Sequence, residues 1–195
     1  MSRFAALDPS GSPMTSSESR FGEMYQDHFR PVHAYCYRRT SSDRAKDAAA
    51  ETFLTAWRKI DQAPHGSDAL PWLYGIARGV VSNAHRSSFR AKRLGQKLAS
   101  IGPPREDAPD DVIVMRHETS QILSALGDLS SDDQEVLRLS IWEELPGSDL
   151  AIALSISEEA ARQRLSRAKK RLADSYNRLE ATASNGSITV EGGAQ

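Results

Sequence analysis

The chain has 195 residues, and its 25 lysines and arginines nearly balance its 26 aspartates and glutamates, which leaves a formal net charge of −1. Only 39% of the residues are hydrophobic and no stretch approaches the ~18 apolar residues of a membrane span, which excludes an integral membrane protein. The single cysteine, Cys36, excludes a disulfide framework and a CxxC redox or metal site. The first residues lack a basic segment followed by an apolar core, so we expect no secretory signal, no membrane insertion and a cytoplasmic location.

The charges are segregated along the chain. Residues 69–105 contain seven basic and no acidic residues, residues 106–149 contain twelve acidic and two basic ones, and residues 160–171 contain six basic and no acidic ones. Basic blocks of this kind suit the phosphate backbone of nucleic acids. Two solvated helix faces would carry the same charges, so the pattern leaves both interpretations open.

The first part of the chain has a tail followed by a long helical pattern. Residues 1–18 are rich in Ser, Pro and Gly and are predicted to be disordered. The stretch 45–60 contains no glycine or proline and is dominated by helix-forming residues. Apolar residues share one stripe of this helix, namely Phe53, Leu54, Trp57 and Ile60.

A loop is predicted over residues 61–70, because Pro64 and Gly66 interrupt helices. Pro71 suits the first turn of the helix that follows. This helix is expected to have an apolar side formed by Leu73, Ile76, Ala77, Val80 and Ala84.

Residues 98–112 contain three prolines and an acidic cluster, and they are predicted to be a flexible linker. The linker separates two small helical domains, roughly residues 19–97 and 113–180. Residues 181–195 are rich in Gly, Ser and Thr and are expected to be a disordered tail. The predicted fold is therefore all-α, with two small domains.

The second domain begins with two predicted helices. The first covers residues 112–126. Ser131 followed by Gln134 has the spacing of a capping box, so Ser131 is expected to open the next helix, which runs to about Glu144.

Two further helices are expected after the breaker at residues 145–147. Ser148 is predicted to cap a short helix over residues 149–154. Ser157 is predicted to cap a last, strongly basic helix that continues to about Leu179.

These last two helices form a candidate helix-turn-helix. One side of the basic helix is apolar, with Ala161, Leu165, Ala168 and Leu172, and is expected to pack on Leu150, Ala151 and Leu154. The opposite side is polar, with Glu159, Gln163, Arg167 and Lys170. Glutamine can pair with adenine and arginine with guanine, while Arg162, Arg164, Lys169 and Arg171 could neutralise phosphates. A basic amphipathic helix in a bundle would have the same pattern.

Segment 71–93 combines the aromatic residues Trp72, Tyr74 and Phe89 with clustered arginines. Aromatic faces stack on unpaired bases, and arginine follows the backbone of a single strand. The alternative is that Trp72 and Tyr74 are core residues, and the position of Trp72 at a helix start favours that interpretation.

Five segments, in this order, resemble bacterial sigma factors of the extracytoplasmic-function (ECF) type, the small two-domain branch of the sigma-70 superfamily. They are FGEMYQDHFRPVHAYCYRR, DAAAETFLTAWR, PWLYGIAR, LSSDDQEVLRLSIWEEL and the basic helix-turn-helix. The resemblance implies that residues 19–97 form sigma region 2 and residues 113–180 form sigma region 4. It also implies that the chain binds core RNA polymerase and directs initiation at specific promoters.

The resemblance further implies how the polymerase is bound. Region 2 would dock on the largest subunit through Tyr25, Phe29, Asp47, Glu51, Thr52, Phe53, Leu54, Trp57 and Arg58. Region 4 would lie on the flap of the second-largest subunit, and the acidic linker would pass near the active site. An anti-sigma factor is a further implied partner.

Contacts to promoter DNA are implied in both regions. The loop over residues 61–70 and the helix after it would capture flipped bases of the minus-10 element, with contacts from Trp72, Arg78, Asn83, Arg86, Arg90 and Arg93. The minus-35 element would be contacted by Ser157, Glu159, Arg162, Gln163, Arg164, Ser166, Arg167, Lys170 and Arg171. Ser155 stands where the family often has glycine in the turn, so it must avoid positive φ or accept strain.

Three other classes of protein are alternatives to this family. A stand-alone helix-turn-helix regulator predicts a dimer and a palindromic site. A metal-dependent hydrolase would need the acidic cluster of Asp128, Asp132, Asp133 and Glu135, which helix capping explains, and the five histidines form no HxxxH pair. A helical scaffold does not explain the two basic blocks. We therefore expect no enzymatic activity, no metal and no cofactor.

Overall fold

The computed structural model describes the backbone of residues 15–96 and 117–186 and the side chains of residues 15–86 and 121–182. Every regular element in these ranges is a helix, and the chain divides into two compact units between Asp110 and Asp111. The all-α prediction is confirmed, while the predicted linker lies outside the described residues. None of the helices in those ranges is long and apolar enough to cross a membrane.

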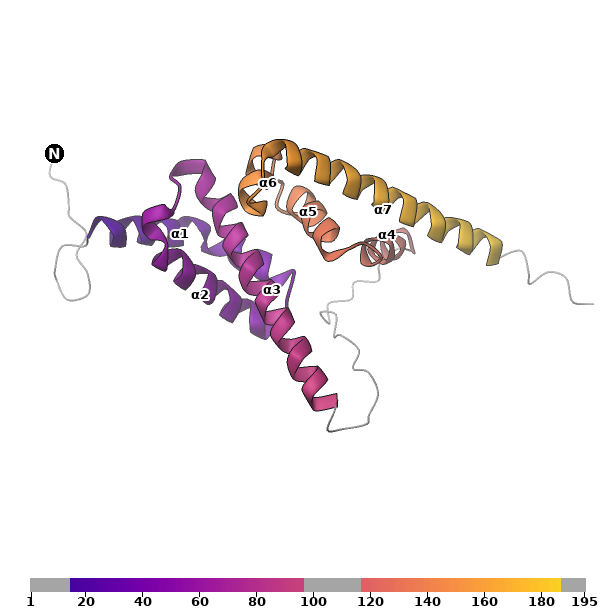
Figure 1. Ribbon diagram of the computed structural model, residues 1–195, viewed down its shortest axis with the longest axis horizontal. Coiled ribbons are helices and arrows are strands. Elements are labelled where there is room, and N and C mark those ends of the chain that lie inside the picture. The colour runs from indigo at the N-terminus through magenta and orange to yellow at the C-terminus, as the bar shows by residue number, and fades with distance from the viewer. Residues whose placement is uncertain (1–14, 97–116, 187–195) are drawn as a thin grey trace, which may run out of the picture. The chain divides into compact units, whose positions relative to one another are not determined.

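Residues 15–96, the described part of the first unit, form three α-helices, with two short 3-10 helices between the second and third (Figure 1). They are α1 (Ser16–Tyr37), α2 (Ser42–Arg58), η1 (Ile60–Gln62), η2 (Gly66–Asp68) and α3 (Ala69–Gln96). The two 3-10 helices occupy the predicted loop, and Pro71 lies in the first turn of α3 as predicted.

Helix α1 begins inside the segment predicted to be a disordered tail. The hydroxyl of Thr15 accepts a hydrogen bond from the backbone N–H of Glu18 at 3.2 Å. The Thr15 N–H in turn donates to the Glu18 carboxylate at 2.6 Å. This capping box satisfies two donors that the helix start leaves free, so helical structure begins at Ser16.

Small side chains and one phenylalanine form the buried face of α2. The buried residues are Ala45, Ala48, Ala49, Thr52, Phe53 and Ala56. Leu54 and Trp57 are 44% and 38% exposed, so the predicted apolar stripe is divided between core and surface.

The buried face of α3 is rotated from the predicted one. Leu73, Tyr74, Ala77 and Val81 are buried, whereas the expected core residues Ile76, Val80 and Ala84 are only half-buried. Tyr74 packs on Tyr35 with 5.2 Å between ring centroids, which makes it a core residue. Trp72, the residue at which a core position was favoured, is only half-buried.

The second unit contains α4 (His117–Gly127), α5 (Ser131–Ile141), α6 (Gly147–Leu154) and α7 (Glu158–Gly186). Helix α7, drawn towards yellow in Figure 1, packs against all three of the others. Two predicted boundaries were wrong: α5 ends three residues before Glu144, and α7 continues beyond Leu179 to Gly186.

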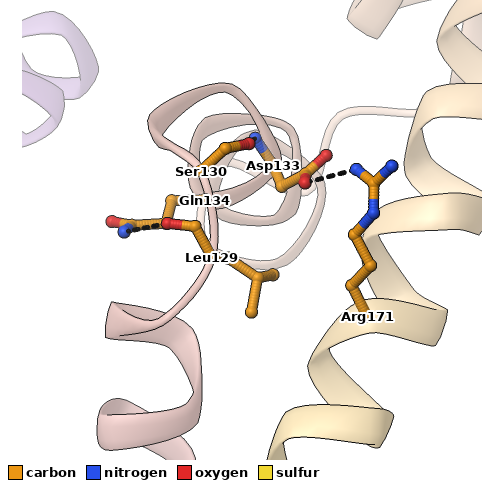
Figure 2. Close-up of polar contacts among 5 residues, drawn as sticks. All are labelled: Leu129, Ser130, Asp133, Gln134 and Arg171. Carbon is orange, nitrogen blue, oxygen red and sulfur yellow. Dashed lines mark hydrogen bonds and ion pairs between the residues drawn. The ribbon is translucent and has the colours of Figure 1, made fainter.

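The cap of α5 is one residue earlier than predicted. The hydroxyl of Ser130, not that of Ser131, accepts from the N–H of Asp133 at 3.2 Å. The Gln134 side chain donates to the carbonyl of Leu129 at 3.0 Å instead of closing a capping box (Figure 2). Both bonds satisfy backbone groups at the junction of α4 and α5.

The turn between α6 and α7 combines one confirmed cap with one strained residue. Ser157 caps α7, since its hydroxyl accepts from the N–H of Ala160 at 3.2 Å. Ser148 does not cap α6, which begins after Pro146 without a side-chain cap. Ser155 adopts φ 54° and ψ 45°, so it accepts the left-handed conformation in place of glycine.

Candidate nucleic-acid and partner-binding surfaces

Helix α7 separates an apolar face from a polar one as its sequence predicts. Ala161 and Ala168 are fully buried, and Leu165 and Leu172 are half-buried. The opposite side is exposed over Glu159, Gln163, Arg167 and Lys170, which we call the recognition face. A helix that is firmly packed on one side and polar on the other can enter a major groove without losing its own support.

Hydrogen bonds link three residues of the recognition face. The side-chain N–H of Gln163 donates to the Glu159 carboxylate at 3.3 Å, and Arg167 donates to the carbonyl oxygen of Gln163 at 2.9 Å. An amide has two N–H groups and two acceptor sites, so Gln163 keeps one of each for another partner. That remaining pair suits the two-point contact that glutamine makes with adenine.

Other predicted minus-35 residues have partners within the protein. Arg162 pairs with Glu158 at 3.7 Å, with both side chains more than half exposed. The Ser157 hydroxyl serves as the cap of α7, so a DNA contact from it would compete with that bond. Ser166 is exposed and available on the same helix.

Arg171 forms an ion pair with Asp133 across the second unit. The two groups are 2.5 Å apart, and the Asp133 side chain is 8% exposed while that of Arg171 is 59% exposed (Figure 2). A groove of about 350 Å³ runs beside this pair, between the start of α5 and α7, and Arg164 and Arg167 line it. Arg171 therefore braces α7 against α5, a contact that charge patterning did not predict.

The acidic cluster at the start of α5 has a structural role. The Asp133 carboxylate pairs with Arg171, and the Asp128 carboxylate accepts from the hydroxyl of the buried Ser175 at 2.9 Å. Helix capping was the predicted explanation of this acidic cluster, and the structure adds two contacts from the cluster to α7. Within the described ranges, no group of three or more His, Cys, Asp or Glu side chains could hold a metal ion.

The first unit carries an aromatic patch on α1 and α2. Tyr25, Phe29 and Trp57 are exposed in it, Phe21 is half-buried, and Phe53 lies buried beneath them. Ring centroids are 4.8 Å apart for Tyr25 and Phe53 and 5.2 Å apart for Phe21 and Trp57. Tyr25 and Phe29 are 42% and 36% exposed, and Leu54 lies exposed on α2. Exposed apolar clusters mark surfaces that bind another macromolecule.

Most of the predicted docking residues contribute to this side of α2. Asp47, Glu51 and Arg58 are exposed, and Arg58 pairs with Glu51 at 3.6 Å. Thr52 and Phe53 are buried, so they support the surface from below. The sequence analysis missed Phe21, although its spacing of four residues from Tyr25 on a helix was a readable signal.

The predicted minus-10 residues fall on two sides of α3. At 100° per residue, Asn83 and Arg86 share the side of Trp72, whereas Arg78 lies about 120° around the axis. Asn83 and Arg86 are exposed, and Arg86 donates to the Asn83 carbonyl oxygen at 2.8 Å. The side chains of Arg90 and Arg93 lie outside the described residues.

Comparison with known families matches both units. Residues 24–91 match the family model for Sigma-70 region 2, and residues 119–172 match that for Sigma-70, region 4. The two models together cover more than half of the chain and correspond to its two compact units.

Individual relatives of this chain are also described as sigma factors. The chain is 31% identical over 131 residues to a probable RNA polymerase sigma factor, RfaY, of Xanthomonas campestris pv. campestris, covering 64% of this chain and 32% of that protein. It is 29% identical over 156 residues to the ECF RNA polymerase sigma factor BldN of Streptomyces coelicolor, covering 78% of this chain and 59% of that protein. The chain thus spans about a third and about three fifths of these two relatives.

A solved structure has the same fold. It is the co-crystal structure of the sigma factor RpoE in complex with the anti-sigma factor NepR from Bartonella quintana. The TM-score is 0.57 at 22% identity, and the match covers 80% of this chain and 96% of that one.

Proposed function

Because this chain belongs to the sigma-70 family, in its ECF branch, we propose that it binds core RNA polymerase and directs initiation at promoters with a minus-10 and a minus-35 element. The observation that carries the proposal is the pairing of two unlike surfaces on one chain. The first unit exposes an aromatic patch suited to protein, and the second exposes a polar face on a capped helix-turn-helix. In this role the chain performs no bond chemistry of its own.

Docking on the largest polymerase subunit is assigned to the aromatic patch and the exposed face of α2. Tyr25, Phe29, Leu54 and Trp57 are each 36–44% exposed, and such a group of large apolar side chains is stabilised when a partner covers it. Asp47 and Glu51 would provide the polar rim.

A second docking surface is assigned to the second unit. Four large apolar side chains there are 41–56% exposed, namely Ile122, Leu123, Ile141 and Trp142. We assign them to the flap of the second-largest subunit, since exposed large apolar side chains mark surfaces that bind another macromolecule.

Promoter opening is assigned to the α2–α3 loop (residues 59–68) and the start of α3. Unstacking a base costs a few kcal/mol, which is comparable to the ~1–3 kcal/mol gained when it stacks on an aromatic side chain. Trp72 is half-buried, so part of the residue remains accessible, and Asn83 and Arg86 are exposed on the same side of the helix.

An anti-sigma factor is proposed as a regulatory partner. The RpoE structure contains the anti-sigma factor NepR, and its fold matches that of this chain. A protein that covered the aromatic patch would block the surface assigned to polymerase.

Since polymerase is the partner on which initiation depends, we place this chain in the cytoplasm.

Run-off transcription with purified core polymerase on a promoter library tests the proposal. We expect transcripts from a defined subset of promoters only when the chain is present, and their shared sequences should define the two elements. Identical transcripts with and without the chain, or no association with core polymerase, would contradict the proposal.

Substitution of the aromatic patch isolates the docking step. Trp57→Ala and Leu54→Ala should weaken binding to core polymerase, because both side chains are exposed and contribute contact area. Tyr37→Ala is the matched control, since Tyr37 is 39% exposed at the other end of α1. Binding should be measured by titrating labelled protein with core polymerase. Equal affinities in all three variants would contradict the assignment of the docking surface to the aromatic patch.

A further inference from the structure

Arg20 on α1 contacts the α2–α3 loop through three backbone carbonyl groups. Its guanidinium donates to the carbonyl oxygen of Ile60 at 3.0 Å, to that of Ala63, and to that of Pro64 at 3.4 Å. These acceptors are 40 to 44 residues further along the chain. One side chain thus holds a segment that local sequence cannot fix.

The loop contains only short helical turns of three residues each, which lack the repeated hydrogen bonds of an α-helix. It contains the two short 3-10 helices η1 and η2, and Gly66, the first residue of η2, has a φ of +64°. At the end of η1 the N–H of Ala63 donates to the carbonyl of Ile60 at 3.2 Å. Arg20 adds a second donor to that carbonyl and also donates to the carbonyls of Ala63 and Pro64.

The chemistry of arginine suits this position. A guanidinium has five N–H donors in a rigid plane and stays charged at any physiological pH. It can therefore hold three carbonyl oxygens that face it from one loop. The ammonium of a lysine has the same charge but a compact, point-like geometry.

We propose that Arg20 is a positioning residue for promoter opening, which holds the α2–α3 loop in the shape that captures a flipped base of the minus-10 element. This inference rests on the proposed function of the loop. Arg20 directly precedes Phe21, whose ring lies 5.2 Å from that of Trp57 in the aromatic patch. The hydrogen bonds of Arg20 thus connect α1, the helix assigned to polymerase docking, with the loop assigned to promoter opening.

The test compares Arg20→Gln with Arg30→Gln in complete holoenzyme on a promoter recovered by run-off transcription. Arg30 is an exposed arginine on the same helix, so the control loses the same charge. Three quantities are measured: affinity for core polymerase, the rate of open-complex formation on duplex promoter, and discrimination against a substituted minus-10 base on a template opened in advance.

We expect R20Q to bind core polymerase like the wild type but to open duplex promoter about tenfold more slowly, since charge-assisted hydrogen bonds to the loop are lost. It should also discriminate less between minus-10 bases on the pre-opened template. A reduced folded fraction would lower all activities together and leave that discrimination ratio unchanged. R30Q should match the wild type in all three measurements.

Hydrogen exchange adds a direct reading of the loop, in which the amides of residues 60–68 should exchange faster in R20Q while those of α2 do not. If R20Q is unfolded at the assay temperature, Arg20→Lys decides the question, with a smaller loss of discrimination expected. Wild-type opening and discrimination in R20Q, or in R20K where R20Q is unfolded, overturn the inference. A wild-type chain that fails to initiate at all counts against the proposed function instead.

Discussion

Single side chains on the recognition face of α7 show how exposed polar residues can be arranged before any partner arrives. Glu159, Gln163 and Arg167 are hydrogen-bonded in sequence along the helix, each four residues from the next. The chain of bonds fixes the orientation of the Gln163 amide, which would otherwise rotate freely. Preorganised donors and acceptors lose less conformational freedom when they meet a base edge.

The first prediction concerns these residues. Gln163→Ala and Arg167→Ala should each reduce preference for the native minus-35 element by ~1–3 kcal/mol per lost base contact. The measurement is competition binding of holoenzyme to promoters with single substitutions in that element. Arg178→Ala, on the same helix beyond the helix-turn-helix, is the control and should leave the preference unchanged. Unaltered preference in both variants would refute the assignment of this face.

The second prediction concerns His28 on α1. Burial lowers the pKa of His28 below its usual value, and the nearby Asp27 partly opposes that shift. The unfolded chain therefore takes up a proton at a higher pH than the folded protein does, near its usual pKa of about 6.5. Stability of the first unit should be fully present above that pH and should fall as the pH drops through it towards the folded pKa.

Hydrogen exchange of α1 amides at about pH 7.5 and about pH 5.5, corrected for intrinsic exchange rates, measures this effect. His28→Gln should reduce the difference in stability between the two conditions. His85→Gln, an exposed histidine of α3, should retain the wild-type difference. The same difference in the His28 variant would assign the acid sensitivity to another group.

At the scale of elements, polar contacts between distant helices brace the second unit. Asp133 at the start of α5 pairs with Arg171 of α7, and Asp128 accepts from Ser175 one turn further along α7. Ser175 is buried on the same side of α7 as Ala168, so its contact adds to the apolar packing of that side. Two polar contacts, at Arg171 and at Ser175, therefore help to hold the helix that presents the recognition face.

The third prediction follows from the unequal burial of this ion pair. Arg171→Gln should destabilise the second unit by ~1–3 kcal/mol, because it leaves the buried Asp133 carboxylate without its cation. Asp133→Asn should cost less, since the exposed guanidinium that remains can be solvated. Arg162→Gln removes an exposed pair and should cost below ~1 kcal/mol. Chemical denaturation followed by exchange of α7 amides gives the order, and equal losses in all three would contradict it.

Elements also show where periodicity was a sufficient guide and where it was not. The sequence correctly predicted which residues of the basic helix lie on its apolar and polar faces, because apolar and charged residues separate clearly around that helix. On α2 and α3 apolar residues occupy more than one face, so spacing could not tell Leu54, which is exposed, from Phe53, which is buried. The caps differ for a similar reason, since Ser130 and Ser131 are both suitable caps and only the backbone decides between them.

At the scale of the whole molecule, the chain consists of two units with different surfaces and a formal net charge of −1. A near-neutral chain lacks the general attraction to DNA that a strongly basic one has. In the proposed function each unit would bind its half of a promoter weakly, and holding both units on one large partner would raise the effective concentration of each.

The fourth prediction follows from this division. The isolated chain should give no specific footprint on its promoter at concentrations where holoenzyme protects both elements. Footprinting of chain, core polymerase and holoenzyme side by side makes the measurement, with core polymerase as the control. A tight, specific footprint from the chain alone would point to a stand-alone regulator instead.

The sequence by itself determined the all-α class, the division into two helical units, the basic helix-turn-helix and the segment that forms the loop before α3. These features depend on interactions within a few residues, such as helix propensity, prolines, caps and i to i+4 spacing, which a sequence displays directly. Only the tertiary structure decided which apolar residues are buried, that Ser155 adopts a left-handed conformation, and that Arg171 and Arg20 bind partners about 40 residues away. Contacts of that range arise from the packing of helices against one another, and no local pattern encodes them.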